Sequence, residues 1–377
     1  MPRASAPRKP ARPWFASGPC PKPPDWRIEK LADVCAHRYH RAPPAQKKIH
    51  ELLERSTDLL AIPDDYITLI VPGSASGAFE TALWSLLGPR PITALVSDHF
   101  SRLWAKDLTE VLDLRATTVR DAPFGDFPDT HGIDPDNDVI FVWNGTTSGV
   151  CVPTQDWLDE SRRGLLLCDA AAAAFIMPVP VAKLDVMTWS WQKGLGGEAG
   201  FGMISLSPKA QARLSPPPRP VPLVMRIADE KGLRAPVAQH RLINTLSMLA
   251  AEDALTGLRW AQEIGGREAL MARTRANADC VSQWLANSSW AQSCAVRDAV
   301  RSPTPVCIIP RQIADEPNDD LIDRMVTFLA EHEAAFDVRG YRAMPPHLRL
   351  WCGPTVETAD LRAALDWLDW SYTQCCP

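Results

Sequence analysis

The chain has 377 residues, of which 46% are hydrophobic and 23% charged, as is typical of a globular protein long enough for two domains. Its net charge of −5 gives no reason to expect nucleic acid as a partner, and no apolar run of about 18 residues predicts a membrane-spanning helix. The ten cysteines include no Cys-x-x-Cys pair and no cysteine–histidine spacing suited to zinc. We therefore expect reduced thiols, no metal site and a cytoplasmic protein without a membrane partner.

The N-terminal segment "MPRASAPRKPARPWFASGPCPKPPDW" is basic and rich in proline. It lacks the apolar core of a secretory signal. Proline favours extended backbone and does not support a regular helix. We expect residues 1–25 to form an extended arm without regular secondary structure.

Patterns typical of helices and of strands alternate between about residues 60 and 260. Apolar positions at helical spacing predict helices, and short continuous apolar runs predict parallel strands that are buried on both faces. The predicted helices span 45–62, 74–88 and 101–114, and the predicted strands span 93–97, 138–144, 164–169 and 202–207. This alternation predicts an α/β domain with a mostly parallel sheet.

The C-terminal part predicts a second, smaller domain. Residues 215–224 are rich in proline and predict an irregular excursion, and residues 235–266 predict a long helical region that two glycines end. A further helix follows, and then two strands alternate with two helices. We expect a large domain over 26–265 and a smaller α+β domain over 266–377.

Polar side chains follow two of the predicted strands. Asn144, Thr146 and Thr147 follow one strand, and Asp169 ends the next. Ligands of an open parallel sheet bind beyond the carboxyl ends of its strands. Asp169 lies between "LLLC" and "AAAAF", so we expect it to be buried and to need a cationic partner. An aspartate at the end of a strand is as often a helix cap or a turn residue, so its interpretation depends on its neighbours.

The stretch "WSWQKGLGGEAG" places Lys193 between two tryptophans and a series of glycines. A lysine in such surroundings more often extends along apolar surface to reach water than acts in catalysis. Together with a buried Asp169, however, it predicts a pyridoxal phosphate site, in which the lysine forms a Schiff base and the aspartate keeps the ring nitrogen protonated. The turn "VPGSASGAFE" leads into a helix and suits the cofactor phosphate.

These motifs resemble, in type and order, those of the phosphoserine aminotransferases, which are class-V, fold-type I pyridoxal phosphate enzymes. The similar segments are "FASGPCPKP", "HRAPPAQKKIHELLERSTDLLAIPDDY", "GSASGAFE", "NGTTSGV", "LLLCDAAAAAF", "SWQKGLGGEAGFGMISLSP", "INTLSML" and "YRAMPPHLRLWCGPTVE". The resemblance extends along nearly the whole chain. It implies a homodimer with shared active sites, and transfer of an amino group between glutamate and 3-phosphohydroxypyruvate in serine synthesis.

The resemblance also implies roles for individual residues. Lys193 would carry the cofactor and later move the α-proton, and Asp169 would pair with the ring nitrogen. The implied cofactor contacts are Trp104 stacking on the ring, Thr146 at the phenolic oxygen, Ala75, Ser76 and Gln192 at the phosphate, and Asn244 and Thr245 at the phosphate from the other subunit. The implied substrate contacts are Arg349 at the α-carboxylate and, from the neighbouring subunit, His40 and Arg41 at the distal anion.

The chain departs from the family pattern at two positions that help some members to bind the substrate phosphate. Ser76 replaces an arginine, and Tyr341 replaces a histidine. Arg38 and Arg342 are the candidates that remain for this contact.

Two other functions stay open. One is a fold-type I aminotransferase for another small keto acid, of the alanine–glyoxylate kind, which would need no cations at the distal end of its substrate. The other is a catalytically inactive interaction protein on the same scaffold, which the presence of Lys193, Asp169, Trp104 and Arg349 disfavours.

Overall fold

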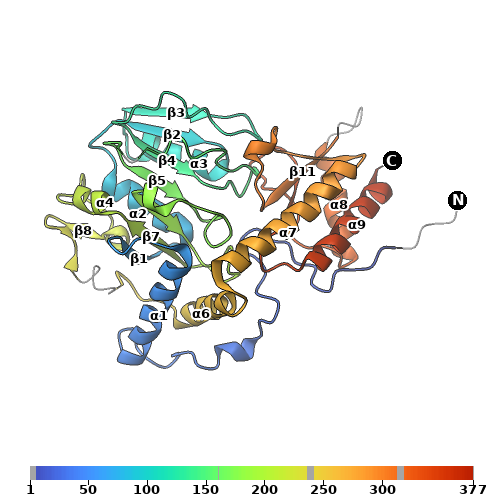
Figure 1. The fold of residues 1–377 in the computed structure, drawn as a ribbon, viewed down its shortest axis with the longest axis horizontal. Helices are drawn as coiled ribbons and strands as arrows, with labels where there is room; N and C mark the ends of the chain where they lie inside the picture. Colours follow the sequence, from blue (N-terminus) through green and yellow to red (C-terminus); the bar gives the residue numbers. More distant parts are fainter. Residues whose placement is uncertain (1–5, 160, 236–241, 312–317, 377) are drawn as a thin grey trace.

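The computed structural model describes residues 6–159, 161–235, 242–311 and 318–376. A seven-stranded sheet forms the centre of its larger part (Figure 1). The strands lie in the order β1-β7-β6-β5-β4-β2-β3, and their bounds are Ile67–Pro72 (β1), Ile92–Val96 (β2), Thr117–Asp121 (β3), Asp138–Val142 (β4), Leu166–Asp169 (β5), Val186–Trp189 (β6) and Phe201–Leu206 (β7). Strands β6, β5, β4, β2 and β3 run parallel to one another, which confirms the predicted α/β class.

The parallel orientation predicted for residues 202–207 is wrong, because β7 pairs antiparallel with both β1 and β6. Residues 190–200, which join β6 to β7, contain no helix. A parallel neighbour requires a crossover of about a dozen residues or more, usually with a helix, so a connection without one makes the chain reverse. This reversal places Lys193 in a loop at the carboxyl end of β6.

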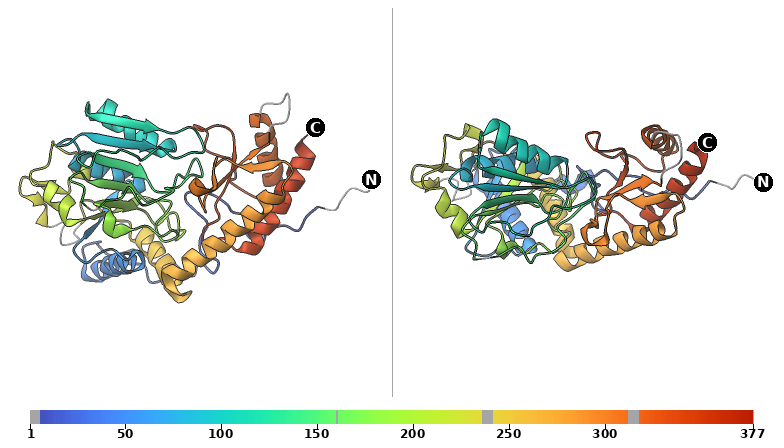
Figure 2. Two further views of the ribbon diagram at one scale, coloured as in Figure 1. Left: turned by 45° about the horizontal axis from the view of Figure 1, so that its top comes forward. Right: turned by 90° about the horizontal axis from the view of Figure 1, so that it is seen from above.

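Helices cover both faces of the sheet (Figure 2). Helices α2 (Ser74–Leu86), α3 (His99–Lys106) and α4 (Pro208–Arg213) pack on one face, and α1 (Pro43–Leu60) and α6 (Met248–Glu263) pack on the other. Alternate strand residues enter opposite cores: Leu69 and Val71 pack on the α2 side, whereas Ile70 packs on the α1 side. Burial on both faces explains why these strands are continuously apolar in the sequence.

Two predicted helices have different bounds in the structure. The helix predicted over 101–114 begins at His99 and changes at Asp107 into a π-helical turn, η2 (Asp107–Val111). The long helix predicted from residue 235 begins only at Met248 among the described residues, because the Ser247 side chain caps it by accepting from the Ala250 N–H. Residues 242–246 precede this cap and are not helical, and residues 236–241 lie outside the described part of the chain.

The C-terminal part forms a three-stranded antiparallel sheet flanked by helices, at the end of the molecule where both termini lie (Figures 1 and 2). Its elements are α7 (Gly266–Asn287), β10 (Ala291–Ser293), β11 (Val306–Pro310), α8 (Asn318–Glu331), β12 (Leu348–Leu350) and α9 (Thr358–Cys375). Gly265 and Gly266 both have positive φ between α6 and α7, which supports our proposal of a domain boundary at this point.

Several short elements complete the described chain. They are η1 (Ile28–Leu31), η3 (Val181–Lys183), η4 (Leu223–Met225), η5 (Asp298–Val300) and the hairpin of β8 (Ala228–Asp229) and β9 (Gly232–Leu233). Within the described residues, every helix is too short or too polar to cross a membrane. All ten cysteines have free thiols.

The N-terminal arm connects the C-terminal part to the loop that carries Lys193. The Phe15 carbonyl accepts from the Trp351 N–H at 3.0 Å, and the Cys20 N–H donates to the Gln192 carbonyl at 2.8 Å. The described arm has no helix or strand before residue 28, only an isolated bridge at Trp14. Between residues 6 and 25 the arm has no regular helix or sheet, and it packs on the rest of the chain at the buried Phe15 and Cys20.

Candidate active site

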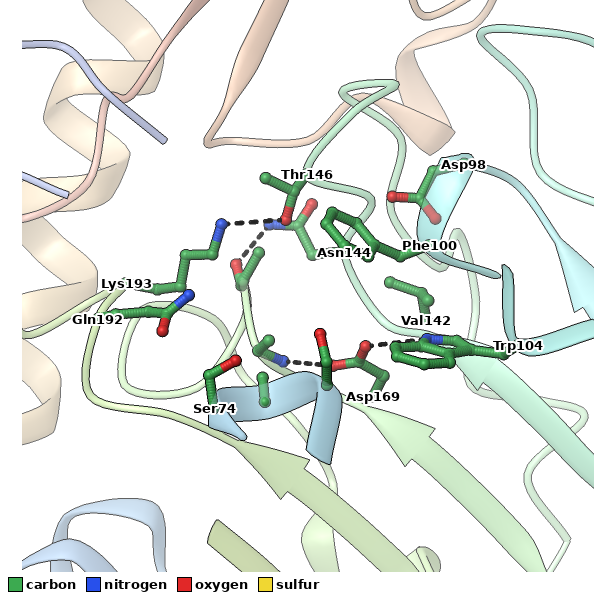
Figure 3. A pocket seen from close by; sticks show the side chains of 14 residues that line it. Ser74, Asp98, Phe100, Trp104, Val142, Asn144, Thr146, Asp169, Gln192 and Lys193 are labelled. Atoms are coloured by element: carbon green, nitrogen blue, oxygen red, sulfur yellow. Dashed lines mark hydrogen bonds between the residues drawn. The ribbon is translucent and has the colours of Figure 1, made fainter. Parts of the chain in front are cut away.

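A cavity opens at the carboxyl ends of the parallel strands (Figure 3). The residues that line it are Ser74, Ala75, Ser76, Asp98, Phe100, Trp104, Val142, Asn144, Thr146, Asp169, Ala171, Ala172, Gln192 and Lys193. All the residues that the sequence assigned to one subunit's cofactor site are among them, although they come from five separate segments.

Asp169 ends β5 with its carboxylate inside the cavity (Figure 3). It is 5% exposed. Oδ1 accepts from the Ala171 N–H at 3.0 Å, and Oδ2 accepts from the indole N–H of Trp104 at 3.2 Å. Burial raises the pKa of Asp169 to about 6, in spite of these two donors. A cation or protonated nitrogen in the cavity would therefore stabilise its ionised form.

Lys193 enters the cavity from the β6–β7 connection and is 7% exposed. Its Nζ donates to the Ser17 carbonyl of the N-terminal arm and lies 3.5 Å from the Thr146 hydroxyl. Burial lowers the pKa of Lys193 to about 8. The amine therefore reaches its neutral, nucleophilic form at a lower pH than a free lysine.

The glycines after Lys193 allow neighbouring backbone to approach closely. A Cβ at Gly196, where φ is +64°, would collide with the Pro21 carbonyl oxygen of the arm. A Cβ at Gly194 would lie 2.8 Å from the Ala174 carbonyl oxygen. Trp191 packs in the core beside this loop and is fully buried. The glycines thus fit the lysine loop between the arm and the segment after β5.

The N-terminus of α2 forms one wall of the cavity and is suited to a phosphate group. Gly73 precedes the helix at φ +87°, and no side chain caps the first turn. Ala75 and Ser76 lie in that turn, so its backbone N–H groups lack intrahelical partners. Gln192 also lines the cavity, and its side-chain amide nitrogen can donate to an anion. These groups fit a dianion held by backbone donors.

Arg349, on β12, contacts the cavity residue Thr146. Its Nη1 donates to the Thr146 carbonyl at 3.1 Å, while its Nε is buried without a partner. Burial lowers the pKa of Arg349, and in the described part of the chain no carboxylate pairs with it. A largely buried guanidinium without a counter-charge is suited to binding an anionic ligand.

The four residues that the sequence assigned to a neighbouring subunit lie outside this cavity. His40 and Arg41 precede α1, where His40 is buried with Nε2 unpartnered and Arg41 is exposed with its guanidinium over the Tyr39 ring. Asn244 and Thr245 precede α6, and Thr245 is exposed. Their assignment to a second subunit stays a prediction.

Several cavity residues were missed by the sequence reasoning, of which Asp98 is the most informative. It follows β2 as Asp169 ends β5, so the same strand-end signal could have identified it. Its carboxylate caps α3 by accepting from the Ser101 N–H and also accepts from the Thr147 hydroxyl at 3.2 Å.

Asn144 was predicted at its strand end, and its Nδ2 donates to the Ala172 and Thr304 carbonyls, which joins the two parts of the molecule.

Comparisons with known proteins agree with this geometry. The model of the class-V aminotransferase family matches residues 29–338. The chain is 43% identical to the phosphoserine aminotransferase of Methanosarcina mazei over 97% of this chain and 98% of that protein. Among solved structures, it is similar to the phosphoserine aminotransferase of Bacillus circulans subsp. alkalophilus, with a TM-score of 0.79, 18% identity, and coverage of 96% and 98%.

The fold alone does not select one substrate. The ureidoglycine–glyoxylate aminotransferase of Bacillus subtilis matches with a TM-score of 0.80 and 17% identity, covering 97% of this chain and 94% of that one. The sequence identity to the Methanosarcina protein is far higher, and it extends through the whole chain. From the matched family model and this identity, the chain belongs to the class-V aminotransferases.

Proposed function

We propose that the chain is a phosphoserine aminotransferase, which uses pyridoxal 5′-phosphate to transfer an amino group between L-glutamate and 3-phosphohydroxypyruvate in L-serine biosynthesis. The observation that carries this proposal is that Lys193, Asp169 and the N-terminus of α2 line one cavity. The identity to the Methanosarcina phosphoserine aminotransferase supports the choice of substrate.

Residues that line the cavity would hold the cofactor at four points. The first-turn N–H groups at Ala75 and Ser76, with the Gln192 side chain, would bind its phosphate. Asp169 would accept a hydrogen bond from its ring nitrogen and keep that nitrogen protonated, and the Thr146 hydroxyl would contact its phenolic oxygen. Lys193 would attach it covalently. When bound, pyridoxal phosphate supplies the electron sink that this chemistry requires.

Lys193 also has the properties of the group that moves the α-proton. Its pKa of about 8 allows the amine to accept a proton near neutral pH and to return it. Burial excludes bulk water from Nζ, so the proton stays between lysine and substrate. The Ser17 carbonyl and the Thr146 hydroxyl are acceptors that orient the ammonium form.

Arg349 would bind the α-carboxylate that glutamate and phosphoserine share. The guanidinium offers two parallel donors to a carboxylate, and Thr146 fixes its position through Nη1. This contact would align the substrate over the end of the cavity nearest Lys193 and Thr146.

The distal anion of the substrate would be bound by His40 and Arg41 of a second copy in a homodimer. Both residues lie outside the cavity of their own chain, and the family resemblance assigns them to the neighbour's site. Asn244 and Thr245 would likewise reach the neighbour's cofactor phosphate. We also propose a cytoplasmic location, which the ten free thiols favour.

An aminotransferase for a small keto acid without a distal anion is the second candidate, since a glyoxylate aminotransferase matches the fold equally well. It differs in needing no distal cation. If the first proposal holds, Arg41→Ala should therefore weaken the binding of phosphoserine at least about tenfold more than the binding of alanine. The reason is that only phosphoserine loses a charged contact. Equal losses for both amino acids would favour the second candidate.

The direct test is an absorbance spectrum of the purified protein with pyridoxal phosphate, followed by addition of glutamate. We expect a visible band that glutamate converts to the spectrum of the amino form of the cofactor, and that 3-phosphohydroxypyruvate restores. Borohydride reduction and peptide mapping should label Lys193. A spectrum that glutamate does not change would contradict the proposed activity.

The shared site is tested by complementation. A Lys193→Ala dimer lacks the amine at both sites, and an Arg41→Ala dimer binds substrate poorly at both. Unfolding the two variants together and refolding makes about half of the dimers mixed, and each mixed dimer has one intact site. About a quarter of wild-type activity should return. No recovery, with mixed dimers confirmed, would mean that each site belongs to one chain.

A further inference from the structure

The indole of Trp104 makes a contact that stacking on a cofactor ring does not explain. Its Nε1–H donates to Oδ2 of Asp169 at 3.2 Å, on the side of the cavity opposite Lys193 (Figure 3). Trp104 is 3% exposed, and its ring lies 5.2 Å from that of Phe79. The N–H therefore faces the carboxylate rather than solvent.

Helix α3 holds this indole in place independently of any ligand. Asp98 and Ser101 form a reciprocal capping box at its first turn, with hydrogen bonds of 2.9 Å in both directions. The Thr147 hydroxyl donates to the same Asp98 carboxylate. Since Trp104 lies in the second turn of this helix and packs on α2, the position of its N–H is set by the fold.

Buried indoles in this protein do not generally have acceptors. Counting partners among the described residues alone, five tryptophans have a buried N–H without one: Trp157, Trp189, Trp191, Trp351 and Trp367. The contact of Trp104 is therefore not a general consequence of burying an indole. Trp284 provides a matched case elsewhere, because its N–H donates to Asp369 at 3.0 Å, far from the cavity in sequence and on α7.

The charged groups around Asp169 act on its ionised form in opposite directions, so an uncharged donor can still favour the carboxylate. Asp98, from the loop before α3, disfavours the ionised form of Asp169, and Lys193, from the β6–β7 connection, favours it. Cys168, next to it on β5, is a buried thiol whose pKa burial raises. The Ala171 and Trp104 N–H groups are uncharged donors, so they stabilise the carboxylate whatever the protonation of Lys193.

We propose that Trp104 is a positioning residue that acts through Asp169, orienting its carboxylate and favouring the ionised form that pairs with the ring nitrogen of the cofactor. The proposal rests on the proposed function, because it needs pyridoxal phosphate as the ligand. Of the two donors to Asp169, the Trp104 N–H is the one that a side-chain substitution can remove.

The test is the affinity of the cofactor-free protein for pyridoxal phosphate, measured between about pH 5 and pH 8.5. Trp104→Phe keeps an aromatic ring and removes the N–H. Without this donor the pKa of Asp169 rises, so the carboxyl stays neutral to a higher pH. We expect the acid-side midpoint for loss of affinity to move up by about one pH unit, which weakens binding about tenfold below it.

Two controls separate this effect from packing. Trp284→Phe removes the same kind of indole–aspartate bond on α7 and should keep the wild-type midpoint. In an Asp169→Asn background, Trp104→Phe should cause little further loss of affinity for pyridoxal phosphate. That loss should not depend on pH, because no carboxylate remains to ionise. If Trp104→Phe does not fold, Trp104→Leu, which also removes the N–H, should move the midpoint in the same direction.

The outcomes are distinguishable. A wild-type protein that does not bind pyridoxal phosphate contradicts the proposed function itself. A wild-type protein that binds, with an unmoved midpoint in Trp104→Phe, contradicts only the role of Trp104. An equal loss at every pH, repeated in the Asp169→Asn background, would mean that Trp104 contributes ring packing alone.

Discussion

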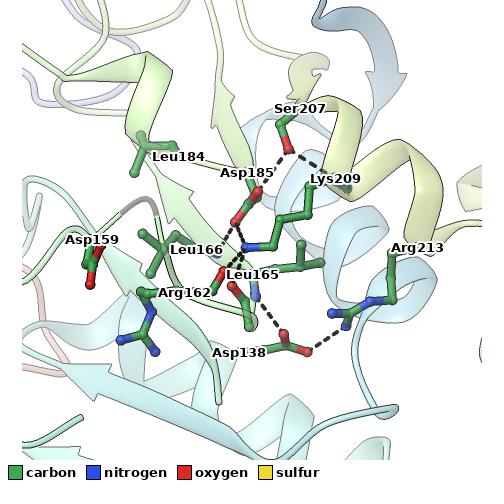
Figure 4. A network of polar contacts seen from close by, with 12 residues as sticks. Asp138, Asp159, Arg162, Leu165, Leu166, Leu184, Asp185, Ser207, Lys209 and Arg213 are labelled. Carbon is green, nitrogen blue, oxygen red and sulfur yellow. Dashed lines mark hydrogen bonds and ion pairs between the residues drawn. The ribbon is translucent and has the colours of Figure 1, made fainter. Parts of the chain in front are cut away.

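The amino and carboxyl ends of the central strands both hold buried charged side chains, but they differ in how these charges are satisfied. At the amino ends, Asp138 accepts from the Leu165 N–H at 2.7 Å and from Arg213 at 3.0 Å (Figure 4). Nearby, Asp185 accepts from the Leu166 N–H, the Ser207 hydroxyl and Lys209. Each carboxylate in this network has both a backbone donor and a cation.

At the carboxyl ends, the charged groups lack such partners. Asp169 has two uncharged donors, Lys193 has two uncharged acceptors, and Arg349 has one. Burial raises the pKa of Asp169 to about 6 and lowers that of Lys193 to about 8. Buried charges without counter-charges are costly, and they cluster where a ligand will satisfy them. The difference indicates that one end stabilises the sheet and the other binds the ligand.

The largest effect that follows from this difference is on catalysis. Lys193→Ala should lower turnover by about 10⁴-fold or more, because both covalent attachment and proton transfer depend on the amine. The cofactor-free variant should be at least as stable as the wild type, since a desolvated amine has been removed. Steady-state kinetics measures the loss of turnover, and thermal unfolding measures the stability of the cofactor-free variant. A variant that unfolds readily would mean that Lys193 has a structural role.

The opposite result is expected at the amino ends. Asp138→Ala should lower the free energy of unfolding by about 3–5 kcal/mol, because it leaves Arg213 and the Leu165 N–H without their acceptor. Turnover per folded molecule should stay near that of the wild type. Chemical denaturation and active-site titration measure these quantities. Arg163→Ala, which breaks an exposed ion pair with Asp136, is the control and should leave the unfolding curve unchanged.

The sequence predicted the carboxyl-end site better than the amino-end network. Asp169 and Lys193 follow buried strands, and the position of strand ends is a local property of apolar runs. Asp138 and Arg213 are 75 residues apart, and no local pattern relates them. Their contact depends on how α4 packs after β7, and the sequence had assigned β7 the wrong direction.

The environment of individual site residues was also beyond local reasoning. The resemblance assigned Trp104 to the ring of the cofactor, but its contact with Asp169 depends on the packing of α3 against α2. The arm was predicted to be extended, yet nothing in its composition indicated that the Ser17 carbonyl would meet Lys193. Such contacts join segments that are far apart in the chain, so they require the folded structure.

Burial raises the pKa of Asp138 as well as that of Asp169, so the contribution of the carboxyl ends to the pH dependence of stability is isolated by changing Asp169 alone. In the cofactor-free protein, Asp169 has a folded-state pKa of about 6, above its ordinary value of 3.8. Between these values the folded chain holds a proton that the unfolded chain has lost, so stability falls as pH rises from about 4 to 6. Asp169→Asn should remove this fall, gaining about 3 kcal/mol relative to the wild type across that window. Denaturation at a series of pH values would measure it, and a constant difference would contradict the raised pKa.

The smallest effect concerns the two arginines, one at each end. Arg349→Ala should raise the KM for glutamate and for phosphoserine by about 30-fold, because each loses a carboxylate contact worth about 2 kcal/mol. The free energy of unfolding should not fall, since in the described part of the chain no carboxylate pairs with Arg349. Arg213→Ala should do the reverse, with an unchanged KM and a less stable fold, because it leaves the buried Asp138 without its cation. Arg349→Lys sharpens the test: it keeps the charge but loses the planar pair of donors, so its KM should lie between those of the wild type and Arg349→Ala. If both alanine variants instead lost stability and kept their KM, Arg349 would belong to the same class as Arg213, and the substrate carboxylate would have to bind elsewhere.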